Sequence, residues 1–544
     1  MRNLLTVYGG LVLVAAAAGC EAGPGAAAEP PVLKVTSPVR GLIQDHAGQV
    51  TVTGTVAPNA KGDPVDGVLV NAVPATVGAD GTFRATIDVA EGATMIQTIA
   101  RDRNGTTASD TRAVEAGQLR AVGANIPSAV TAAMSADAFA KLSAAAGPIV
   151  KAIDLAAMLA PMQPMVNVGS GCDFGQIFVD NVTFSDIKIA MAPVQGGLSL
   201  RVEIDDLAVP AHLRYRLACL PTGSSNLGIS ATKVVVAGTL NVTPNGMAGF
   251  TTKLASPDVS LTGFQMLGIP SGVLAFLDVD AAISFIVTKG AELAMNPLMN
   301  QALGALAGPQ QLDVLGTKLA MQVAPSAITF DPTGAVIAMN MQAMLAGSEA
   351  SPGFIYTSNG TPTMDPSVGF QLGLADDLAN ELMAELQALG TLDLTMPVQG
   401  GTFDAAQLHM TMPPMISADA TDGRMRVVLG DVLATFTRQG TPVGKAAINA
   451  RIDLKIAPIA SGYTVALQLG TPEIHVDTLD DIANTTGVDD QDLATATGIV
   501  LGAQIDSISK LLLAIPVPAI AGIQIRNLAI GADHGYVMVS GQLE

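Results

Sequence analysis

Tryptophan is absent from this 544-residue sequence, and Phe and Tyr bring the aromatic share to only 3%. Aromatic platforms that stack nucleic-acid bases are therefore not indicated, and neither are the aromatic belts that flank membrane spans. Charged residues make up 14%, with 27 Lys and Arg against 47 Asp and Glu and a net charge of −20. The chain as a whole thus lacks the basic surface that would attract nucleic acid or anionic lipid.

Histidine and cysteine are also scarce, with five and three residues. The Gly-x-Ser-x-Gly, His-Glu-x-x-His and paired Cys-x-x-Cys motifs are absent. Acidic pairs such as Asp205-Asp206 lack EF-hand spacing and are interpreted as solvated loops or helix starts. The histidines occur singly, and we interpret each as a surface or strand residue: His46, His212, His409, His475 and His534. The sequence therefore predicts no catalytic residue, metal site or cofactor.

Apolar residues are abundant, at 49% of the chain. This share is enough to build large cores and excludes a disordered chain. At roughly 150 residues per domain, the length corresponds to three or four domains.

The N-terminal residues 1–20, MRNLLTVYGGLVLVAAAAGC, have the composition of an export signal. Their apolar run is too short to span a bilayer as a helix. Ala17-Ala18-Gly19-Cys20 resembles a bacterial lipobox, which predicts lipidation at Cys20; the alternative is a plain secretory signal in which Cys20 is incidental. Residues 21–31 are rich in Ala, Gly and Pro and are interpreted as a flexible tether.

These N-terminal features predict a protein of the cell envelope that is lipid-anchored to a membrane rather than spanning it. By resemblance to enterobacterial sorting, Glu21 in place of Asp after the modified cysteine indicates the outer membrane, on its periplasmic or surface side. In an exported chain the two remaining cysteines, Cys172 and Cys219, favour one disulfide over two buried free thiols.

Residues 32–118 show short alternating strands separated by turn signals. QVTVTGTVA at residues 49–57 suits a half-buried strand, and Asp80-Gly81 precedes the strand Phe83–Ile87. The segment resembles the Ig-like modules of bacterial surface proteins, although it has neither Cys nor Trp. We expect an antiparallel β-sandwich that serves as a spacer or a binding module.

Residues 121–544 combine long alternating strands with a few apolar helices, an α+β pattern of helix, strands and helix that occurs twice. Helices are expected over Ala129–Leu142, Ile149–Met158, Leu374–Leu389 and about Asp492–Leu513. Hairpins are expected at Pro244-Asn245-Gly246 and at Asp331–Gly334. The two halves divide near residues 320–345, and we assign them the ranges 121–330 and 331–544.

Several segments in residues 121–544 resemble the family of bactericidal/permeability-increasing protein, lipopolysaccharide-binding protein and cholesteryl ester transfer protein, which has the double TULIP fold. The cysteine pair lies in the first half, where that family has its disulfide, and the resemblance thus supports a Cys172–Cys219 bond. VGFQLGLADDLANELMAELQALGTLDL resembles the strand, aspartate and long helix that open the family's second half. The double proline of LHMTMPPMIS and the C-terminal IPVPAIAGIQIRNLAIGADHGYVMVSGQLE add to the likeness.

The resemblance implies two half-domains, each with a long helix wrapped by a curved antiparallel sheet around an apolar lipid tunnel. Lipid is then the expected partner, and the apolar helix faces and methionines supply the candidate tunnel residues. These candidates are Val130, Met134, Leu142, Met158, Leu374, Leu378, Leu382, Leu386, Ile505 and Ile508. Residues 319–423 hold eleven Asp or Glu and no Lys or Arg, which departs from the cationic tip of the endotoxin-binding members.

Our first hypothesis is a lipoprotein that binds, and transfers, phospholipid or another lipid without covalent catalysis. The alternative is a cell-surface scaffold or adhesin that uses the same fold for protein interaction. A hydrolase is the weakest reading, because no catalytic triad can be assembled from the sequence.

Overall fold

The computed structural model describes residues 29–543 apart from 247–248, 276, 304–307, 315, 358, 398–402, 419–424, 459–464 and 480–524. Cys20, the signal and most of the tether therefore lie outside the described residues, as do the helix expected at about Asp492–Leu513 and the candidates Ile505 and Ile508. Among the described helices, none is by itself long and apolar enough to cross a membrane. The consecutive segments Ala136–Lys151 and Leu155–Met162 are together long and apolar enough for a membrane span, but the chain bends by 87° between them.

The described chain forms two compact units. The first comprises the residues up to 37 with 51–86 and 98–110, and the second comprises 38–50, 87–97 and everything from residue 111 onward. Each unit is treated by itself below.

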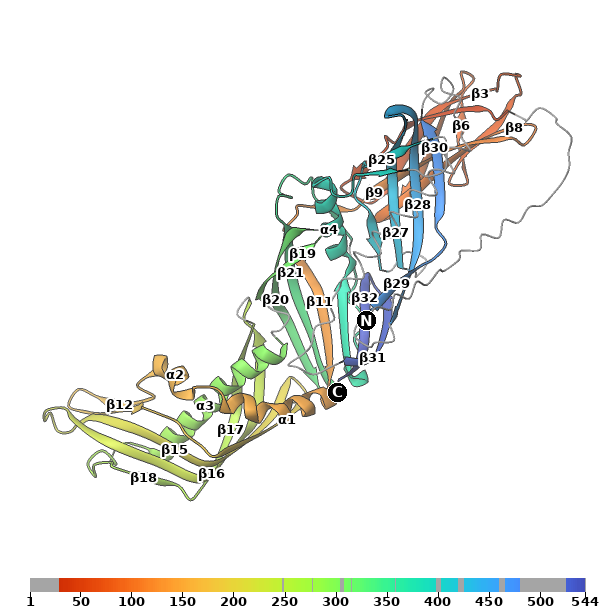
Figure 1. The fold of residues 1–544 in the computed structure, drawn as a ribbon. Coiled ribbons are helices and arrows are strands. Elements are labelled where there is room, and N and C mark those ends of the chain that lie inside the picture. The colour runs from red at the N-terminus through yellow and green to blue at the C-terminus, as the bar shows by residue number, and fades with distance from the viewer. Residues whose placement is uncertain are drawn as a thin grey trace, which may run out of the picture. The chain divides into compact units, whose positions relative to one another are not determined.

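The N-terminal strands form a β-sandwich-like region with two sheets, as the sequence predicts (Figure 1, red and orange). One sheet has the order β1-β3-β7-β6, and the other has the order β2-β9-β8-β4-β5. Strict alternation of exposed and buried residues along β7 explains why the periodicity is visible in the sequence. The bounds are β1 Val32–Ser37, β2 Leu42–Gln44, β3 Gly48–Ala57, β4 Val65–Val70, β5 Val73–Pro74, β6 Thr76–Val77, β7 Thr82–Val89, β8 Gly92–Asp102 and β9 Thr107–Ala116.

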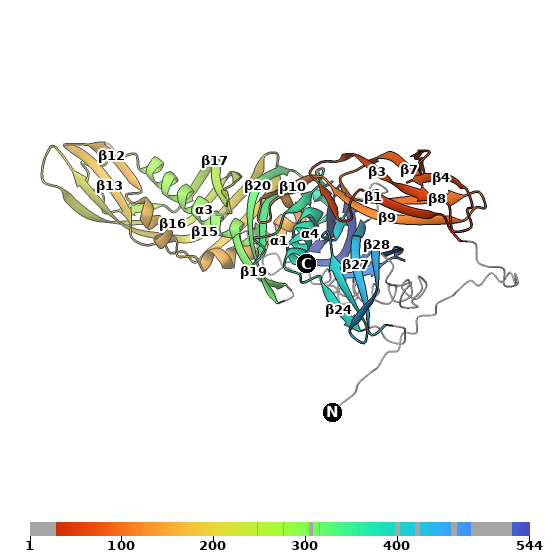
Figure 2. The same cartoon turned by 90° about the horizontal axis from the view of Figure 1, so that it is seen from above.

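The second unit contains a seven-stranded sheet with the path β12-β13-β15-β16-β17, in which β14 pairs with β15 and β18 pairs with β16. β15 and β16 are 20 and 22 residues long and pair along almost their whole length. Helices α1 and α3 pack against this sheet (Figures 1 and 2). The bounds are α1 Ala136–Lys151, α2 Leu155–Leu159, β12 Val166–Ser170, β13 Asp173–Val179, β14 Asp186–Val194, β15 Gly197–Arg216, β16 Gly223–Pro244, β17 Phe250–Thr262, β18 Gln265–Leu267 and α3 Val279–Leu303.

A second sheet of seven strands has the order β19-β20-β21-β11-β23-β32-β31 and thus joins strands that lie far apart in the sequence. The hairpin expected at Asp331–Gly334 connects β20 to β21, which confirms that prediction. The bounds are β11 Ile126–Ser135, β19 Gly308–Val314, β20 Thr317–Asp331, β21 Gly334–Leu345, β23 Phe370–Ala375, β31 Ile525–Asp533 and β32 Tyr536–Leu543.

The third sheet of this unit has the path β24-β25-β27-β28-β29, with β26 on β27 and β30 on β28. Helix α4 contacts β21, β22 and β26, and a short ladder joins β10 to β22. The bounds are β10 Gln118–Arg120, β22 Phe354–Tyr356, α4 Asp376–Ala388, β24 Leu394–Pro397, β25 Ala405–Met410, β26 Met415–Ser417, β27 Met425–Arg438, β28 Thr441–Pro458, β29 Val465–Leu469 and β30 Glu473–Leu479. Single 3-10 turns occur at Ala160–Met162 and Pro366–Val368.

The helix expected over Ala129–Leu142 is only partly present, because residues up to Ser135 belong to strand β11. β11 pairs with β21 on one side and β23 on the other, and seven consecutive residues, 129–135, are buried. A strand buried on both faces has no polar alternation, so its apolar run is easily taken for one face of a helix. Helix α1 then begins after Ser135, whose side chain accepts a hydrogen bond from the Ala138 N–H.

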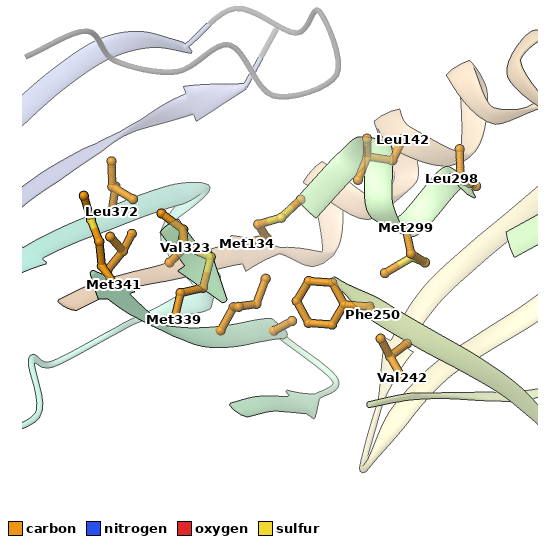
Figure 3. Packing of buried hydrophobic residues seen from close by; sticks show 14 of the residues in the cluster. Met134, Leu142, Val242, Phe250, Leu298, Met299, Val323, Met339, Met341 and Leu372 are labelled. Carbon is orange, nitrogen blue, oxygen red and sulfur yellow. The ribbon is translucent and has the colours of Figure 1, made fainter. Parts of the chain in front are cut away.

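The core of the second unit is continuous between the helices and the β20–β21–β11–β23 part of the second sheet. Figure 3 shows Met134, Met339 and Phe250 in this core, together with Leu298 and Met299 of α3.

Cys172 and Cys219 form a disulfide, which confirms the prediction. It joins the turn before β13 to the turn after β15.

A buried ionic network lies in the same unit, where residue Arg40 meets the third sheet. Arg40 Nη1 donates to Asp431 Oδ1 and to the Thr111 carbonyl, both at 2.7 Å, and Nη2 donates to Asp477 Oδ2 at 3.2 Å. Asn449 Nδ2 donates to the same Thr111 carbonyl at 2.8 Å and to Asp431 Oδ1 at 3.2 Å. The three charged side chains are only 12%, 0% and 8% exposed, so each charge depends on the others for compensation.

Candidate functional site

A small apolar void lies between helix α3 and the sheet of β15, β16 and β17. Its accessible volume is about 10 Å³, and nine of its ten lining residues are apolar. The sheet contributes Leu207, Val209, Ile229, Ser230, Ala231 and Leu261, Phe264 follows β17, and α3 contributes Ile283, Ile286 and Val287. A void of this size holds at most about one water-sized probe, and its apolar walls offer a water almost no partner. The space therefore favours an apolar occupant.

Some exposed apolar side chains neighbour residues of this void, either along the sequence or across a pair of strands. Phe285 stands between the void residues Ile283 and Ile286 on α3 and is 43% exposed. Leu267 of β18 is 68% exposed and pairs with Gly228, next to Ile229 of the void. Exposed side chains of this size cost free energy in water, at roughly 25 cal/mol per Å² of apolar surface. Leu274, in the segment that precedes α3, is also exposed, at 51%. We refer to Phe285, Leu267 and Leu274 together as the apolar rim.

Helix α3 itself is not among the helices that the sequence predicts. Asp278 precedes it, and its carboxylate accepts the Ala281 N–H at 3.0 Å, a capping signal that is visible in the sequence. Gly290 and Pro297 interrupt the apolar pattern, which explains why the segment is easily overlooked. The three residues of α3 that line the void were missed for the same reason.

The predicted tunnel residues occupy other places. Val130 and Met134 of β11 and Leu142 of α1 are buried in the core, whereas Met158 of α2 is half-buried. Val130 lies opposite Leu374 in the β11–β23 ladder. Leu374, Leu378 and Leu382 are half-buried, and Leu386 is fully buried. None of these residues lines the void under α3.

The expected helix at Leu374–Leu389 begins two residues later, as α4 at Asp376, since Leu374 and Ala375 end strand β23. Its burial pattern differs from the predicted leucine stripe. Four acidic residues are at most 3% exposed: Asp376, Asp377, Glu381 and Glu385. Leu378 and Leu382 remain partly exposed on the same helix. The acidic side of α4 thus faces the protein, an arrangement that periodicity of apolar residues cannot reveal.

At the N-terminus of α4, the two aspartates accept hydrogen bonds from two surrounding segments. Asp377 Oδ1 accepts the Thr357 N–H at 2.8 Å, and Asp376 Oδ2 accepts the Ala418 N–H at 2.8 Å. Asn359 Nδ2 bridges them, at 2.8 Å from Asp376 Oδ1 and 3.0 Å from Asp377 Oδ2. The partial positive charge of a helix N-terminus adds to these donors.

Further along α4, the two glutamates accept hydrogen bonds from the backbone of two other segments. Glu381 Oε1 accepts the Gly123 N–H at 2.7 Å. Glu385 accepts the Leu345 N–H with both oxygens at 3.1 Å and the Ser348 hydroxyl at 2.9 Å. Glu381 Oε2 is buried and has no hydrogen-bond partner among the described residues. The helix thereby fixes several chain segments through carboxylates.

Burial raises the pKa of all four carboxyl groups. It raises the pKa of Glu381 to about 8 and that of Asp377 to about 7, and the pKa values of Asp376 and Glu385 also rise. The neighbouring Asp376 charge raises the Asp377 pKa further, whereas Arg120 and hydrogen bonds from Thr357 lower it. Glu381 and Asp377 therefore carry protons at a pH where ordinary carboxyl groups are ionised.

The five histidines are each paired with one carboxylate, and each pair is at least partly exposed. The pairs are His46–Asp45, His212–Asp180, His409–Asp393, His475–Glu473 and His534–Asp533. In the described part of the chain, no three His, Cys, Asp or Glu side chains are grouped so that they can hold a metal ion.

Comparison with known proteins gives one family match and several similar structures. The family model for domain B of glucodextranase matches residues 31–118. No curated protein matches. A crystal structure of lipopolysaccharide binding protein is 11% identical, covers 76% of this chain and 99% of its own, and superposes with a TM-score of 0.37.

Two structures of P47 from Clostridium botulinum are also similar. That from strain E1 is 9% identical, covers 76% of this chain and 98% of its own, and has a TM-score of 0.26. That from strain A2 is 9% identical, covers 78% and 98%, and has a TM-score of 0.28.

Proposed function

We propose that this chain binds lipid in the apolar interior under helix α3, without covalent catalysis. The observation that carries the proposal is the void itself, with its apolar wall and the apolar rim of Phe285, Leu267 and Leu274. The resemblance of residues 121–544 to a lipid-carrying family points to the same class of ligand.

Binding of an acyl chain rests on the hydrophobic effect rather than on charge. Each buried CH₂ contributes about 0.8 kcal/mol, so a chain of about ten methylenes contributes about 8 kcal/mol, which offsets the cost of moving the surrounding side chains and of association. The void of about 10 Å³ is far too small for such a chain. Lipid entry therefore requires α3 to move away from the sheet.

The first test is the composition of the purified protein. Residues 32–544, exported without Cys20 and purified without detergent, are expected to show a discrete excess of native mass. Extraction should resolve this mass into phospholipid or fatty acid. A clean apo mass, together with no uptake from added phospholipid vesicles, contradicts the proposal and favours the scaffold function.

A substitution in the wall of the void locates the bound lipid. Ala231 is 4% exposed and lines the void, so Ala231→Ile fills the space with three additional carbon atoms. We expect lipid content to fall at least threefold, as measured by quantitative lipid mass spectrometry. The matched control is Ala190→Ile, on the exposed side of β14, which should keep its lipid. An equal lipid content in both variants places the ligand elsewhere.

We further propose that Cys20 carries the lipid anchor, that the protein resides at the outer membrane and that it transfers its ligand. The support is the lipobox at residues 17–20. Metabolic labelling with a palmitate analogue should mark the full-length protein and not Cys20→Ala, which should also leave the membrane fraction. Label that persists in Cys20→Ala contradicts the anchor, and transfer is tested with fluorescent phospholipid moving between vesicles.

A further inference from the structure

The first unit contains a groove that the proposed lipid function does not use. Its volume is about 810 Å³, within the range of ligand-binding clefts. It lies over the sheet of β1, β3, β7 and β6, and all of its lining residues belong to the first unit.

The sequence pattern explains the polarity of this groove. β3 and β7 alternate, so their buried side carries Val52, Phe83 and Ala85 whereas their other side carries threonines. Six of the twelve lining residues are threonines: Thr36, Thr53, Thr55, Thr76, Thr82 and Thr86. Each hydroxyl both donates and accepts a hydrogen bond, and sugar hydroxyls have the same dual capacity.

Hydrogen bonds hold the side chains and the backbone around the groove in place. The Thr36 hydroxyl donates to the Thr53 carbonyl at 3.1 Å and lies 3.2 Å from the Thr53 hydroxyl. At the wall, Asp80 Oδ1 accepts both the N–H and the hydroxyl of Thr82, at 3.1 and 2.7 Å. The Gly78 N–H donates to the Thr82 carbonyl at 2.7 Å and closes the turn. Such preorganisation lowers the entropic cost of binding a ligand.

Arg84 gives the groove one charge. It is exposed on β7, lies opposite Thr76 of β6, and has no ion-pair or hydrogen-bond partner in the described part of the chain. The lining contains no Asp or Glu, although the whole chain carries a net charge of −20. A guanidinium offers paired N–H donors that match a carboxylate. An acidic group on a ligand is therefore the partner that suits Arg84.

We propose that this groove binds a saccharide chain that bears carboxylate groups, with Arg84 on a carboxylate and the threonines on sugar hydroxyls. The binding is weak, because Phe83 is only 3% exposed and no aromatic ring is presented for stacking against a sugar face. The site is independent of the apolar interior under α3. Loss of saccharide binding in the groove is therefore expected to leave lipid binding intact, and loss of lipid binding to leave saccharide binding intact.

The test uses ligand-observed NMR on the full chain, with saturation transfer from protein to trigalacturonic acid. Maltotriose, which has the hydroxyls without the carboxylates, is the neutral comparison. We expect transfer to trigalacturonic acid to exceed that to maltotriose at least threefold. Because the protein is strongly acidic, unspecific attraction of an anionic sugar is not expected, and absence of transfer to either sugar overturns the proposal.

Variants assign the signal to the groove. Arg84→Ala, Thr53→Val and Thr86→Val should each reduce transfer to trigalacturonic acid at least threefold, while lipid content is unchanged. The matched control is Arg103→Ala, an exposed arginine of the same unit outside the groove, which should keep the wild-type signal. Equal losses in the Arg84 and Arg103 variants indicate a general charge effect and overturn the proposal. Equal saturation transfer to trigalacturonic acid and to maltotriose in the wild-type protein overturns the proposed pairing of Arg84 with a carboxylate.

Discussion

Replacing Arg40 with alanine is expected to lower the free energy of unfolding of the second unit by about 3–5 kcal/mol. The physical reason is that two buried carboxylates, Asp431 and Asp477, would then lose their ion pairs with the Arg40 guanidinium. Asp431 also accepts the Gly41 and Ala113 N–H groups at 3.0 and 3.2 Å, so it cannot turn away without breaking further hydrogen bonds.

The matched control for this prediction is Arg451→Ala. Arg451 pairs with Glu473, but the two side chains are 42% and 49% exposed. An exposed pair of this kind contributes only about 0–1 kcal/mol. Urea unfolding followed by circular dichroism should therefore separate the two variants clearly. A midpoint for Arg40→Ala that is no lower than that of Arg451→Ala would falsify the role of the network.

Amide exchange provides a local measurement of the same network. The Thr111 N–H donates to Asp477 at 2.9 Å, and the Ala113 N–H donates to Asp431. In Arg40→Ala we expect these two amides to exchange faster before the rest of β9 does, because repulsion between the carboxylates opens this edge first. In Arg451→Ala their exchange should remain as in wild type.

The elements that the sequence predicts well are those with one buried and one solvated face. β7, and the turns at Pro244–Gly246 and Asp331–Gly334, follow directly from alternation and from Gly, Asn and Asp in turns. β11 was assigned to a helix because it is buried on both sides, and α3 was missed because Gly290 and Pro297 interrupt its pattern. Both failures concern apolar segments whose environment is set by tertiary packing.

The candidate site shows the same limit. The leucine periodicity of α4 predicts an apolar buried face, and the structure buries Leu386 together with the acidic residues of that helix. Hydrophobicity assigns Asp and Glu to solvent, and only the backbone N–H groups supplied by distant segments make their burial tolerable. The donors come from residues 123, 345, 357 and 418, none of which a helical pattern can identify. The disulfide was predictable because only two cysteines remained to pair.

The buried carboxyl groups of α4 lead to a pH dependence that is opposite to that of ordinary ion-paired acids. For Glu381 the folded pKa of about 8 lies above the unfolded value near 4.5. The folded state therefore binds more protons than the unfolded state between these values, and stability falls as the pH rises through this window. Asp377 acts in the same direction between about 4 and 7. The full contribution of Glu381 and Asp377 to the free energy of unfolding is therefore present only at the acidic end of these pH windows.

Glu381→Gln is expected to flatten this dependence. Gln retains an oxygen for the Gly123 N–H but cannot ionise, so the variant escapes the cost of a buried charge at high pH. Each pKa unit corresponds to about 1.4 kcal/mol, and we expect the stability of the variant relative to wild type to rise by roughly 2 kcal/mol between pH 6 and 9. The measurement is the urea midpoint at each pH. Comparing the variant with wild type across pH cancels any constant cost of the buried amide.

Two features of the surroundings make this prediction specific. Among the described residues, the charged or titratable groups near the four acids are Arg120, Glu349, Tyr356 and Tyr536. The tyrosine pKa values are raised, mainly by burial, that of Tyr536 to about 12, so neither ionises in the window. Arg120 is the single cation and is already engaged with the Tyr356 ring at 3.3 Å. Arg120 lowers the pKa of Asp377, whereas no cation among the described residues lowers that of Glu381.

The control for the pH series is Glu203→Gln. Hydrogen bonds from Lys233 and Arg201 lower the Glu203 pKa, so its contribution is lost only as the pH falls through that lowered value. Between pH 6 and 9 Glu203 stays ionised in both folded and unfolded chains, and the difference from wild type should be constant. If Glu381→Gln gives the same flat difference, Glu381 is already ionised at pH 6 in the folded protein. Its interior would then have to admit water to the carboxylate, which is incompatible with an oxygen that is buried and without a partner.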